Sequence, residues 1–161
     1  MKDNKGFTLV ELLAVIVILA VIILIAVNAV LPQMQKARKK SFADEGLSFA
    51  KAAENAYVDN QSSGTKAFTV SYLKSNYVTK SDSSYNGCII VNADADGNIT
   101  GKTIYLAQTD KWMIINKTSD VLGQNLDGDV KTYETGDGKW STDYATCTID
   151  GVDSSSVVSG S

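Results

Sequence analysis

The chain has 161 residues, enough for one modest domain, and its overall apolar content of 44% is that of an ordinary soluble protein. A formal net charge of −3 argues against binding nucleic acid by neutralising phosphates. The absence of histidine excludes Ser-His-Asp and Cys-His catalysis and removes the commonest transition-metal ligand.

The apolar residues are concentrated near the N-terminus. Residues 12–27 form an unbroken apolar run, and its flanks extend it to about 25 residues, interrupted by Thr8, Glu11 and Asn28. A helix of about 20 apolar residues spans a bilayer. A secretory signal has a shorter apolar core and a small-residue cleavage site behind it. The candidate small residue here, Gly6, lies ahead of the run, so we expect the segment to stay in the mature protein as a transmembrane helix.

Glu11 does not fit a plain membrane anchor. A carboxylate on a lipid-facing helix costs about 2–3 kcal/mol at the bilayer centre and less near the interface. Two interpretations remain open: Glu11 meets a partner, or it is solvated at the depth of the lipid headgroups.

The charges that flank the apolar segment also conflict with its expected orientation. Lys2 and Lys5 precede the segment, and a basic run at residues 36–40 follows it. Counted alone, these charges place the C-terminal side in the cytoplasm. The size and composition of the following domain favour export instead.

Residues 5–13, Lys-Gly-Phe-Thr-Leu-Val-Glu-Leu-Leu, resemble the processing signal of type IV prepilins. In that family, prepilin peptidase cuts after a glycine that ends a short basic leader. The new N-terminal residue is then methylated, and a glutamate at the fifth mature position is kept for assembly. The resemblance implies cleavage after Gly6, N-methylation of Phe7 and an assembly role for Glu11.

The resemblance also implies an α+β fold of the type IV pilin kind, with one long N-terminal α-helix packed on an antiparallel β-sheet head. It divides the chain into a leader at 1–6, a hydrophobic transmembrane and filament-core helix at 7–32, and a globular head at 33–161 that includes the amphipathic second half of the helix. In a filament, Glu11 of one subunit would pair with the amine of Phe7 of its neighbour, and in a low dielectric that contact would set the axial register.

The pattern stays helical beyond Pro32. A proline either bends a helix or marks where one helix ends and another begins, and the continuing pattern favours a bend. Residues 33–60 read as an amphipathic helix that ends near residues 61–64. Gly46 within it is either a tolerated weak spot or a point of close approach by a strand. The apolar stripe of this helix comprises Phe42, Leu47, Phe49, Ala50, Ala53, Ala56 and Tyr57.

The period of the sequence then changes. Residues 69–77 favour a short helix, and residues 88–92, 103–107 and 111–115 read as strands separated by turn-rich segments. These strands predict an antiparallel meander with one apolar face on the helix. A last strand is expected at residues 144–149.

Cys88 and Cys147 are too few and too far apart for a zinc site of the CxxC kind. Two states remain open. They form one disulfide if the C-terminal part is exported, or they stay as two buried thiols.

Asn92, Asp94 and Asp96 match the first half of an EF-hand calcium loop. Thr103 stands where that loop needs a glutamate, so a hairpin turn is favoured, and the Asp-Gly-Asp motif at 127–129 is interpreted in the same way. We therefore expect no metal and no cofactor.

We expect a non-enzymatic structural subunit of a type IV pilus. The implied partners are other copies in a helical filament, prepilin peptidase, the assembly ATPase and platform machinery, and the membrane before assembly, with no nucleic acid. The implied route runs from a single-pass membrane precursor to a surface fibre for adhesion, biofilm formation or motility. The Lys, Asp and Asn bias resembles clostridial pilins. A pseudopilin of a secretion or DNA-uptake machine is the alternative.

Overall fold

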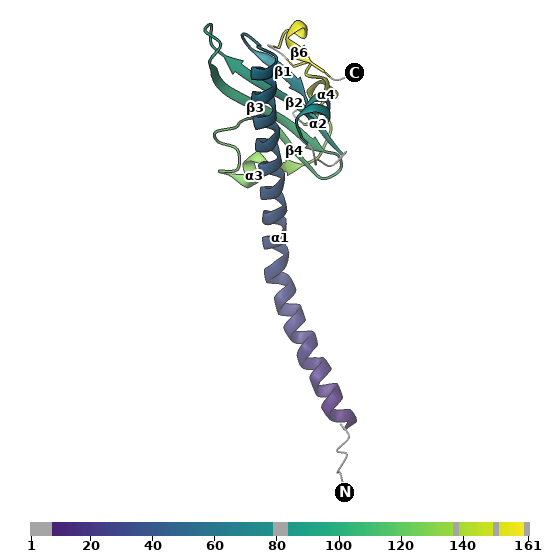
Figure 1. Cartoon of the computed structure of the whole chain (residues 1–161). Helices are drawn as coiled ribbons and strands as arrows, with labels where there is room; N and C mark the ends of the chain where they lie inside the picture. The colour runs from purple at the N-terminus through teal and green to yellow at the C-terminus, as the bar shows by residue number, and fades with distance from the viewer. Residues whose placement is uncertain (1–7, 79–83, 137–138, 150–151, 160–161) are drawn as a thin grey trace. The chain divides into compact units, whose positions relative to one another are not determined.

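A computed structural model describes residues 8–78, 84–136, 139–149 and 152–159 (Figure 1). The chain divides into two compact units, residues 1–38 and 39–161. Helix α1, Leu9–Asp59, supplies the described part of the first unit after Thr8 and the opening of the second unit.

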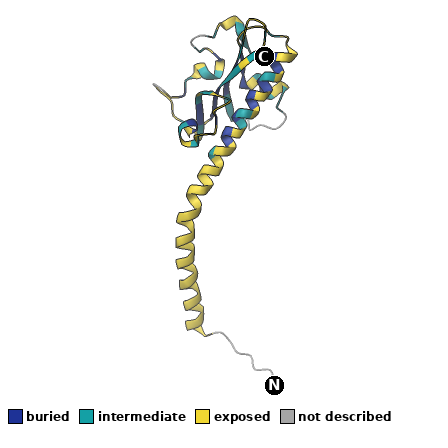
Figure 2. Cartoon of the chain, turned by 90° about the vertical axis from the view of Figure 1, so that its left-hand side faces the viewer, coloured by how far each residue is buried: buried dark blue, intermediate teal, exposed yellow. Residues whose placement is uncertain are grey.

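In the first unit, the apolar residues of α1 are exposed, and this part of the helix is yellow in Figure 2. Among the described residues, α1 is the one helix that is long and apolar enough to cross a membrane by length and composition. The predicted long N-terminal helix is confirmed.

The helix continues through Pro32, so the alternative that one helix ends there is wrong. Proline has no N–H, so the carbonyl of Asn28, four residues earlier, loses its usual helical donor. The side chain of Asn28 in turn donates from Nδ2 to the carbonyl of Leu24 at 3.2 Å. That bond satisfies a polar group inside an apolar stretch.

The second unit contains a six-stranded sheet in the order β5-β4-β3-β2-β1-β6. Neighbouring strands are antiparallel, except that β6 runs parallel to β1. The predicted α+β fold class, a long N-terminal helix with a mostly antiparallel sheet, is confirmed. The strands are β1 (Lys66–Thr69), β2 (Tyr85–Ala93), β3 (Ile99–Gln108), β4 (Trp112–Thr118), β5 (Lys131–Thr132) and β6 (Val157–Val158). The shorter helices are α2 (Val70–Asn76), α3 (Leu126–Asp129), α4 (Thr142–Thr146) and a 3-10 turn at Ser154–Ser156.

One face of the sheet packs on residues 39–59 of α1. The predicted apolar stripe supplies this contact, since its members are buried apart from the half-buried Leu47. Gly46 is a point of close approach. A Cβ there would lie 3.2 Å from Cδ2 of Leu122 and 3.3 Å from Cδ1 of Ile114, a residue of β4. The facing sheet residues in this core are Phe68, Ile89, Val91, Ile104, Leu106 and Ile114.

The opposite face of the sheet carries a second core, because successive residues of a strand point to opposite faces. It gathers side chains from the strands and from the C-terminal segment that lies over them. The buried members are Ala67, Cys88, Ile90, Tyr105, Ala107, Met113, Trp140 and Cys147.

The strands predicted at 88–92, 103–107 and 111–115 correspond to β2, β3 and β4, and the helix predicted at 69–77 is α2. The strand predicted at 144–149 is wrong, because α4 begins at Thr142. Ser141 caps this helix by accepting from the backbone N–H of Asp143, and Cys147 ends it in the left-handed conformation with φ 59°. Local capping here outweighs the alternating pattern.

Candidate functional site

The predicted processing site lies outside the described residues. Gly6 and Phe7 both precede Thr8, where the described chain begins. Cleavage after Gly6 and methylation of Phe7 therefore stay predictions.

Glu11 closes the first turn of α1 together with Thr8. Oε2 of Glu11 accepts from the backbone N–H of Thr8 at 2.9 Å and from its hydroxyl at 2.9 Å. Oγ1 of Thr8 accepts from the backbone N–H of Glu11 at 3.3 Å. These reciprocal bonds form a capping box, which satisfies donors that the start of a helix leaves without partners.

The Thr-x-x-Glu spacing ahead of an apolar run is the signal from which this cap can be predicted. The role in assembly that the resemblance implies for Glu11 did not indicate this helix cap. A carboxylate offers about four acceptor positions, so the cap leaves Glu11 able to accept from a further donor. Capping and pairing with a neighbour's amine are therefore compatible.

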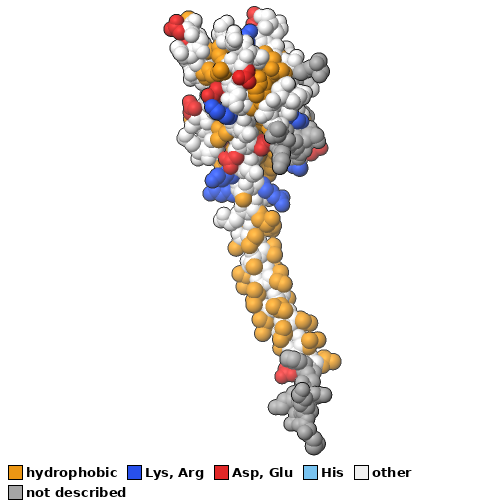
Figure 3. All heavy atoms as spheres, in the orientation of Figure 1, with side chains coloured by type: hydrophobic (Ala, Val, Ile, Leu, Met, Phe, Trp, Pro, Cys, Tyr) orange, Lys and Arg blue, Asp and Glu red, His pale blue; other side chains and the backbone are white. Residues whose placement is uncertain are grey.

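The first half of α1 carries a long exposed apolar surface. From Leu9 to Met34, the large apolar side chains are 45–81% exposed. Figure 3 shows these side chains along the helix. Soluble domains rarely leave an apolar surface of this extent uncovered. The segment needs lipid or other apolar helices around it.

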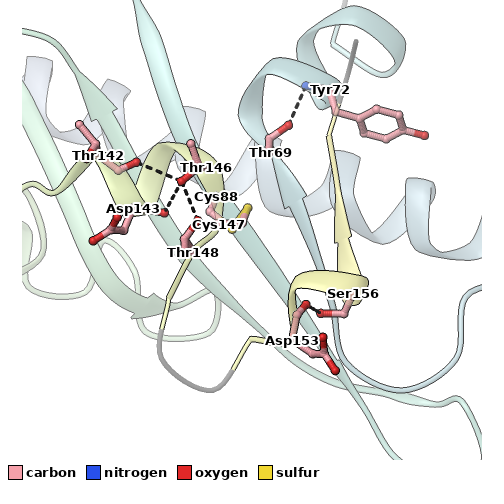
Figure 4. Close-up of a disulfide and its surroundings, with 10 residues drawn as sticks. All are labelled: Thr69, Tyr72, Cys88, Thr142, Asp143, Thr146, Cys147, Thr148, Asp153 and Ser156. Carbon is pink, nitrogen blue, oxygen red and sulfur yellow. Dashed lines mark hydrogen bonds between the residues drawn. A yellow bond between two sulfur atoms is a disulfide. The ribbon is translucent and has the colours of Figure 1, made fainter.

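The sulfurs of Cys88 and Cys147 form a disulfide (Figure 4), the first of the two states that the sequence leaves open. Cys88 lies on β2 and Cys147 ends α4, their Cα atoms are 5.3 Å apart, and both side chains are fully buried. The bond joins residues 59 positions apart and fixes the C-terminal segment to the sheet.

The candidate calcium loop is the hairpin between β2 and β3. Oδ1 of Asp94 accepts from the backbone N–H groups of Asp96 at 3.0 Å and Asn98 at 2.8 Å, and Oδ2 accepts from the Asn98 side chain at 3.1 Å. The Asn98 side-chain bond and then the backbone bonds lower the pKa of Asp94. Asn92 is the last residue but one of β2, and Thr103 lies within β3. Within the described ranges, no three Asp, Glu, Cys or His side chains gather where they could hold a metal ion.

The Asp-Gly-Asp motif at 127–129 anchors the segment between β4 and β5. Asp127 pairs with Lys39 of α1 at 2.6 Å, and the Lys39 ammonium lies 5.6 Å from the ring centroid of Trp112. Asp129 is 6% exposed and pairs with Lys117 at 3.0 Å.

The buried carboxylate of Asp129 also organises its own loop. Oδ2 accepts from the backbone N–H groups of Gly123 at 3.0 Å and Asn125 at 3.3 Å. Burial raises the pKa of Asp129, but the Lys117 side chain and these two N–H groups outweigh that effect and hold the pKa below its ordinary value. The motif is therefore explained by ion pairs and loop capping.

Comparison with known proteins returns one family model, described as the prokaryotic N-terminal methylation motif, which matches residues 1–27. No curated protein and no solved structure matches the chain. The matched residues contain Gly6, Phe7, Glu11 and most of the exposed apolar surface. They support a type IV prepilin-like protein with a membrane-anchored precursor.

Proposed function

We propose that the chain is a structural subunit of a type IV pilus. Prepilin peptidase cuts it after Gly6, Phe7 is methylated, and the mature chains polymerise through α1. The observation that carries this proposal is that the methylation motif at 1–27 overlaps the part of α1, from Leu9 to Met34, whose large apolar side chains are exposed.

Two environments can cover that surface in succession. Before assembly, lipid surrounds the apolar segment, whose length suits a bilayer. In a fibre, the helices of neighbouring subunits take the place of lipid. Burying a Leu, Ile or Val side chain is worth about 1.5–3 kcal/mol relative to leaving it in water. The apolar segment is therefore stable in lipid or among other helices, and it is unfavourable only when it is exposed to water.

Glu11 then sets the register between subunits. Cleavage leaves a positive amine at Phe7, and the carboxylate of a neighbour's Glu11 is the acceptor for it. Inside a bundle of apolar helices, an unpaired charge is penalised by several kcal/mol, so misaligned copies are disfavoured. The proposed division of the chain follows: a leader at 1–6, the anchor and filament core at 7–32, and the head at 33–161.

The head is built for an oxidising compartment. Disulfides persist outside the cytosol, so the bond between Cys88 and Cys147 supports a head that is exported and displayed on the surface fibre. The basic run at 36–40 is the feature that conflicts with this orientation. Part of it has a structural use, because Lys39 pairs with Asp127 and lies over Trp112.

A pseudopilin of a secretion or DNA-uptake machine is the second candidate, because the same N-terminal motif serves both kinds of protein. The head favours the pilus: it has six strands and a C-terminal segment fixed by a disulfide, whereas pseudopilins are often smaller. The wider roles proposed for the fibre are adhesion, biofilm formation and twitching motility, with the assembly ATPase and platform as partners.

Electron microscopy of cells that produce the chain at native level separates the two candidates. The pilus proposal expects long surface fibres that shear off and contain this chain as their main protein. Cells that carry the processed chain only in the membrane fraction, without such fibres, contradict the pilus and favour the pseudopilin. The matched control is Gly6→Val, which we expect to block processing and leave no fibres.

A further inference from the structure

Two cations follow the apolar stretch of α1 within the first unit. Lys36 and Arg38 are exposed, and they come directly after the exposed apolar side chains that end at Met34. Their side chains take part in no ion pair, hydrogen bond or ring contact among the described residues. Lys39, by contrast, belongs to the second unit and pairs there with Asp127. The described fold therefore gives Lys36 and Arg38 no partner.

The position of these two cations along α1 matches the depth of lipid headgroups. A hydrocarbon core of about 30 Å takes about 20 helical residues, and the headgroups extend a bilayer to about 40–45 Å. Residues 12–31 supply the length of the core. Along the helix, Lys36 stands about 38 Å and Arg38 about 40 Å from Glu11, at 1.5 Å per residue. When the apolar run fills the hydrocarbon, Glu11 and the two cations therefore lie at its opposite boundaries.

Lys36 and Arg38 also lie on opposite sides of the helix. Each residue turns an α-helix by about 100°, so side chains two positions apart are separated by about 200°. A protein docked on one side of the helix would contact only one of them, whereas a layer of headgroups surrounds the helix and reaches both. Side chains of a helix lean toward its N-terminus, which here is the membrane side, so both cations can extend back to the lipid.

We propose that Lys36 and Arg38 bind the phosphate groups of anionic phospholipids at the C-terminal end of the membrane span. The inference rests on the membrane anchoring of the precursor, and it goes beyond the proposed function by naming the lipid. Arg38 can hold a phosphate through two parallel N–H bonds, and Lys36 acts as a point charge. The contact gives a use to two cations of the basic run that conflicts with the orientation of an exported head.

Local charge, and not the charge of the whole chain, decides such a preference. The formal net charge is −3, so an anionic membrane repels the chain on average. A Lys or Arg close to an anionic surface favours that surface by about fivefold, so two cations together predict a preference of about 25-fold at low salt. Salt screens exposed charges and weakens the preference.

The lipid that the purified full-length chain retains tests the proposal. The chain is held in uncharged detergent micelles at low salt with equal amounts of phosphatidylglycerol, which is anionic, and phosphatidylcholine, which is zwitterionic. Native mass spectrometry gives the ratio of the two lipids bound. We expect at least about tenfold more phosphatidylglycerol than phosphatidylcholine. Lys36→Gln combined with Arg38→Gln is expected to bring the ratio to within about twofold of one.

The control makes the same substitution at two exposed lysines of the head, Lys111→Gln with Lys131→Gln. It changes the net charge equally, and we expect it to keep the preference for phosphatidylglycerol. All four positions are exposed, so unchanged urea unfolding midpoints exclude a folding defect.

The outcomes separate the lipid contact from the proposed function. If the control loses the preference as fully as the Lys36 and Arg38 variant, net charge alone decides and the proposal is wrong. If the unmodified chain retains both lipids equally, the proposal is wrong and an acidic protein is the partner of these cations. In both cases the pilus stands. A chain that retains neither lipid contradicts the membrane anchoring as well. If the preference holds but cells form no fibres, the pilus fails and the lipid contact stands.

Discussion

At the scale of single residues, Glu11 has two uses that act through the same carboxylate. Within the chain, it completes the capping box with Thr8. Between chains, it is proposed to accept the amine of Phe7. The two uses depend on different properties, because a cap needs an oxygen acceptor whereas the intersubunit contact needs a negative charge.

Glu11→Gln and Thr8→Ala separate these uses. Glutamine keeps a capping oxygen at this position but loses the charge, and alanine at position 8 keeps the charge but loses the cap, which is worth about 1 kcal/mol. We expect Glu11→Gln to lower the fraction of chain in sheared fibres at least about 100-fold, as a buried amine without its partner costs about 3 kcal/mol or more. Thr8→Ala is expected to assemble nearly normally. If both variants lost the same fraction of chain from the sheared fibres, Glu11 would act only as a helix cap and not as a charge between subunits.

Asp129 shows the opposite arrangement, a charge whose partners all lie in its own chain. Its pKa is lowered in the folded head from an ordinary value of 3.8, so its charge stabilises the head above that pH. The stabilisation is lost as the pH falls from 3.8 through the lower folded value.

We expect Asp129→Asn to lower the free energy of unfolding by about 2 kcal/mol at pH 7, because the mutation removes the charged partner of Lys117 and weakens the bonds to two backbone N–H groups. The difference from the unmodified chain is expected to shrink below pH 3.8. Urea unfolding of the detergent-solubilised chain, followed by tryptophan fluorescence, measures both. Asp127→Asn is the control, since its pair with Lys39 is exposed and worth at most about 1 kcal/mol. A difference that is constant with pH would contradict the ion-pair explanation.

At the scale of elements, the head depends on how closely α1 approaches the sheet. Gly46 is a point of close approach, because Leu122 and Ile114 occupy the space that a side chain would need. The C-terminal segment is held differently, by a covalent bond between β2 and the end of α4.

Gly46→Val tests the packing of α1. We expect it to destabilise the head by about 1–3 kcal/mol, because added methyl groups force Leu122 or Ile114 to move. Ser48→Val, at an exposed position of α1, is the matched control, with an expected change of about 0.5 kcal/mol or less. Unfolding free energies of the two variants make the comparison. Gly46→Val as stable as the control would mean that the helix does not need glycine there.

Replacing Cys88 and Cys147 together by alanine tests the covalent link. Without the disulfide, a loop of about 59 residues is no longer closed in the unfolded chain. In the chain-entropy description, the free energy of unfolding then falls by about 4 kcal/mol. We expect the double variant to unfold more easily by that amount, with backbone amides of α4 and β6 exchanging fastest. Urea unfolding and hydrogen exchange measure this. A change under about 1 kcal/mol would mean that packing of the C-terminal segment suffices.

The sequence predicted those helices and strands in which apolar residues recur at a regular spacing. The apolar run, the stripe of the amphipathic helix and strands β2, β3 and β4 each repeat their pattern over several residues. Strands β1, β5 and β6 span only two to four residues, so they carry too little pattern to be predicted. A strand was predicted at residues 144–149 from alternating apolar and polar residues. The structure has helix α4 at Thr142–Thr146 instead, which Ser141 caps and Cys147 ends in the left-handed conformation.

At the scale of the whole molecule, the two units have different surfaces. Most side chains that residues 9–34 present are apolar, and the head buries its own core on both faces of the sheet. The motif of the candidate processing site could be recognised because its residues are contiguous in the sequence, and the family model at residues 1–27 matches it, whereas cleavage after Gly6 stays a prediction. The disulfide was not, because two cysteines 59 positions apart leave pairing undecided until the fold brings them together.

The mass of the chain in purified fibres tests the central claim most directly. The account predicts that the fibre protein starts at Phe7, carries one N-terminal methyl group, lacks residues 1–6 and retains the disulfide between Cys88 and Cys147. Tandem mass spectrometry of the N-terminal peptide identifies each feature. A fibre protein that keeps the leader, or that is cut behind the apolar helix, would contradict both the processing at Gly6 and assembly through α1.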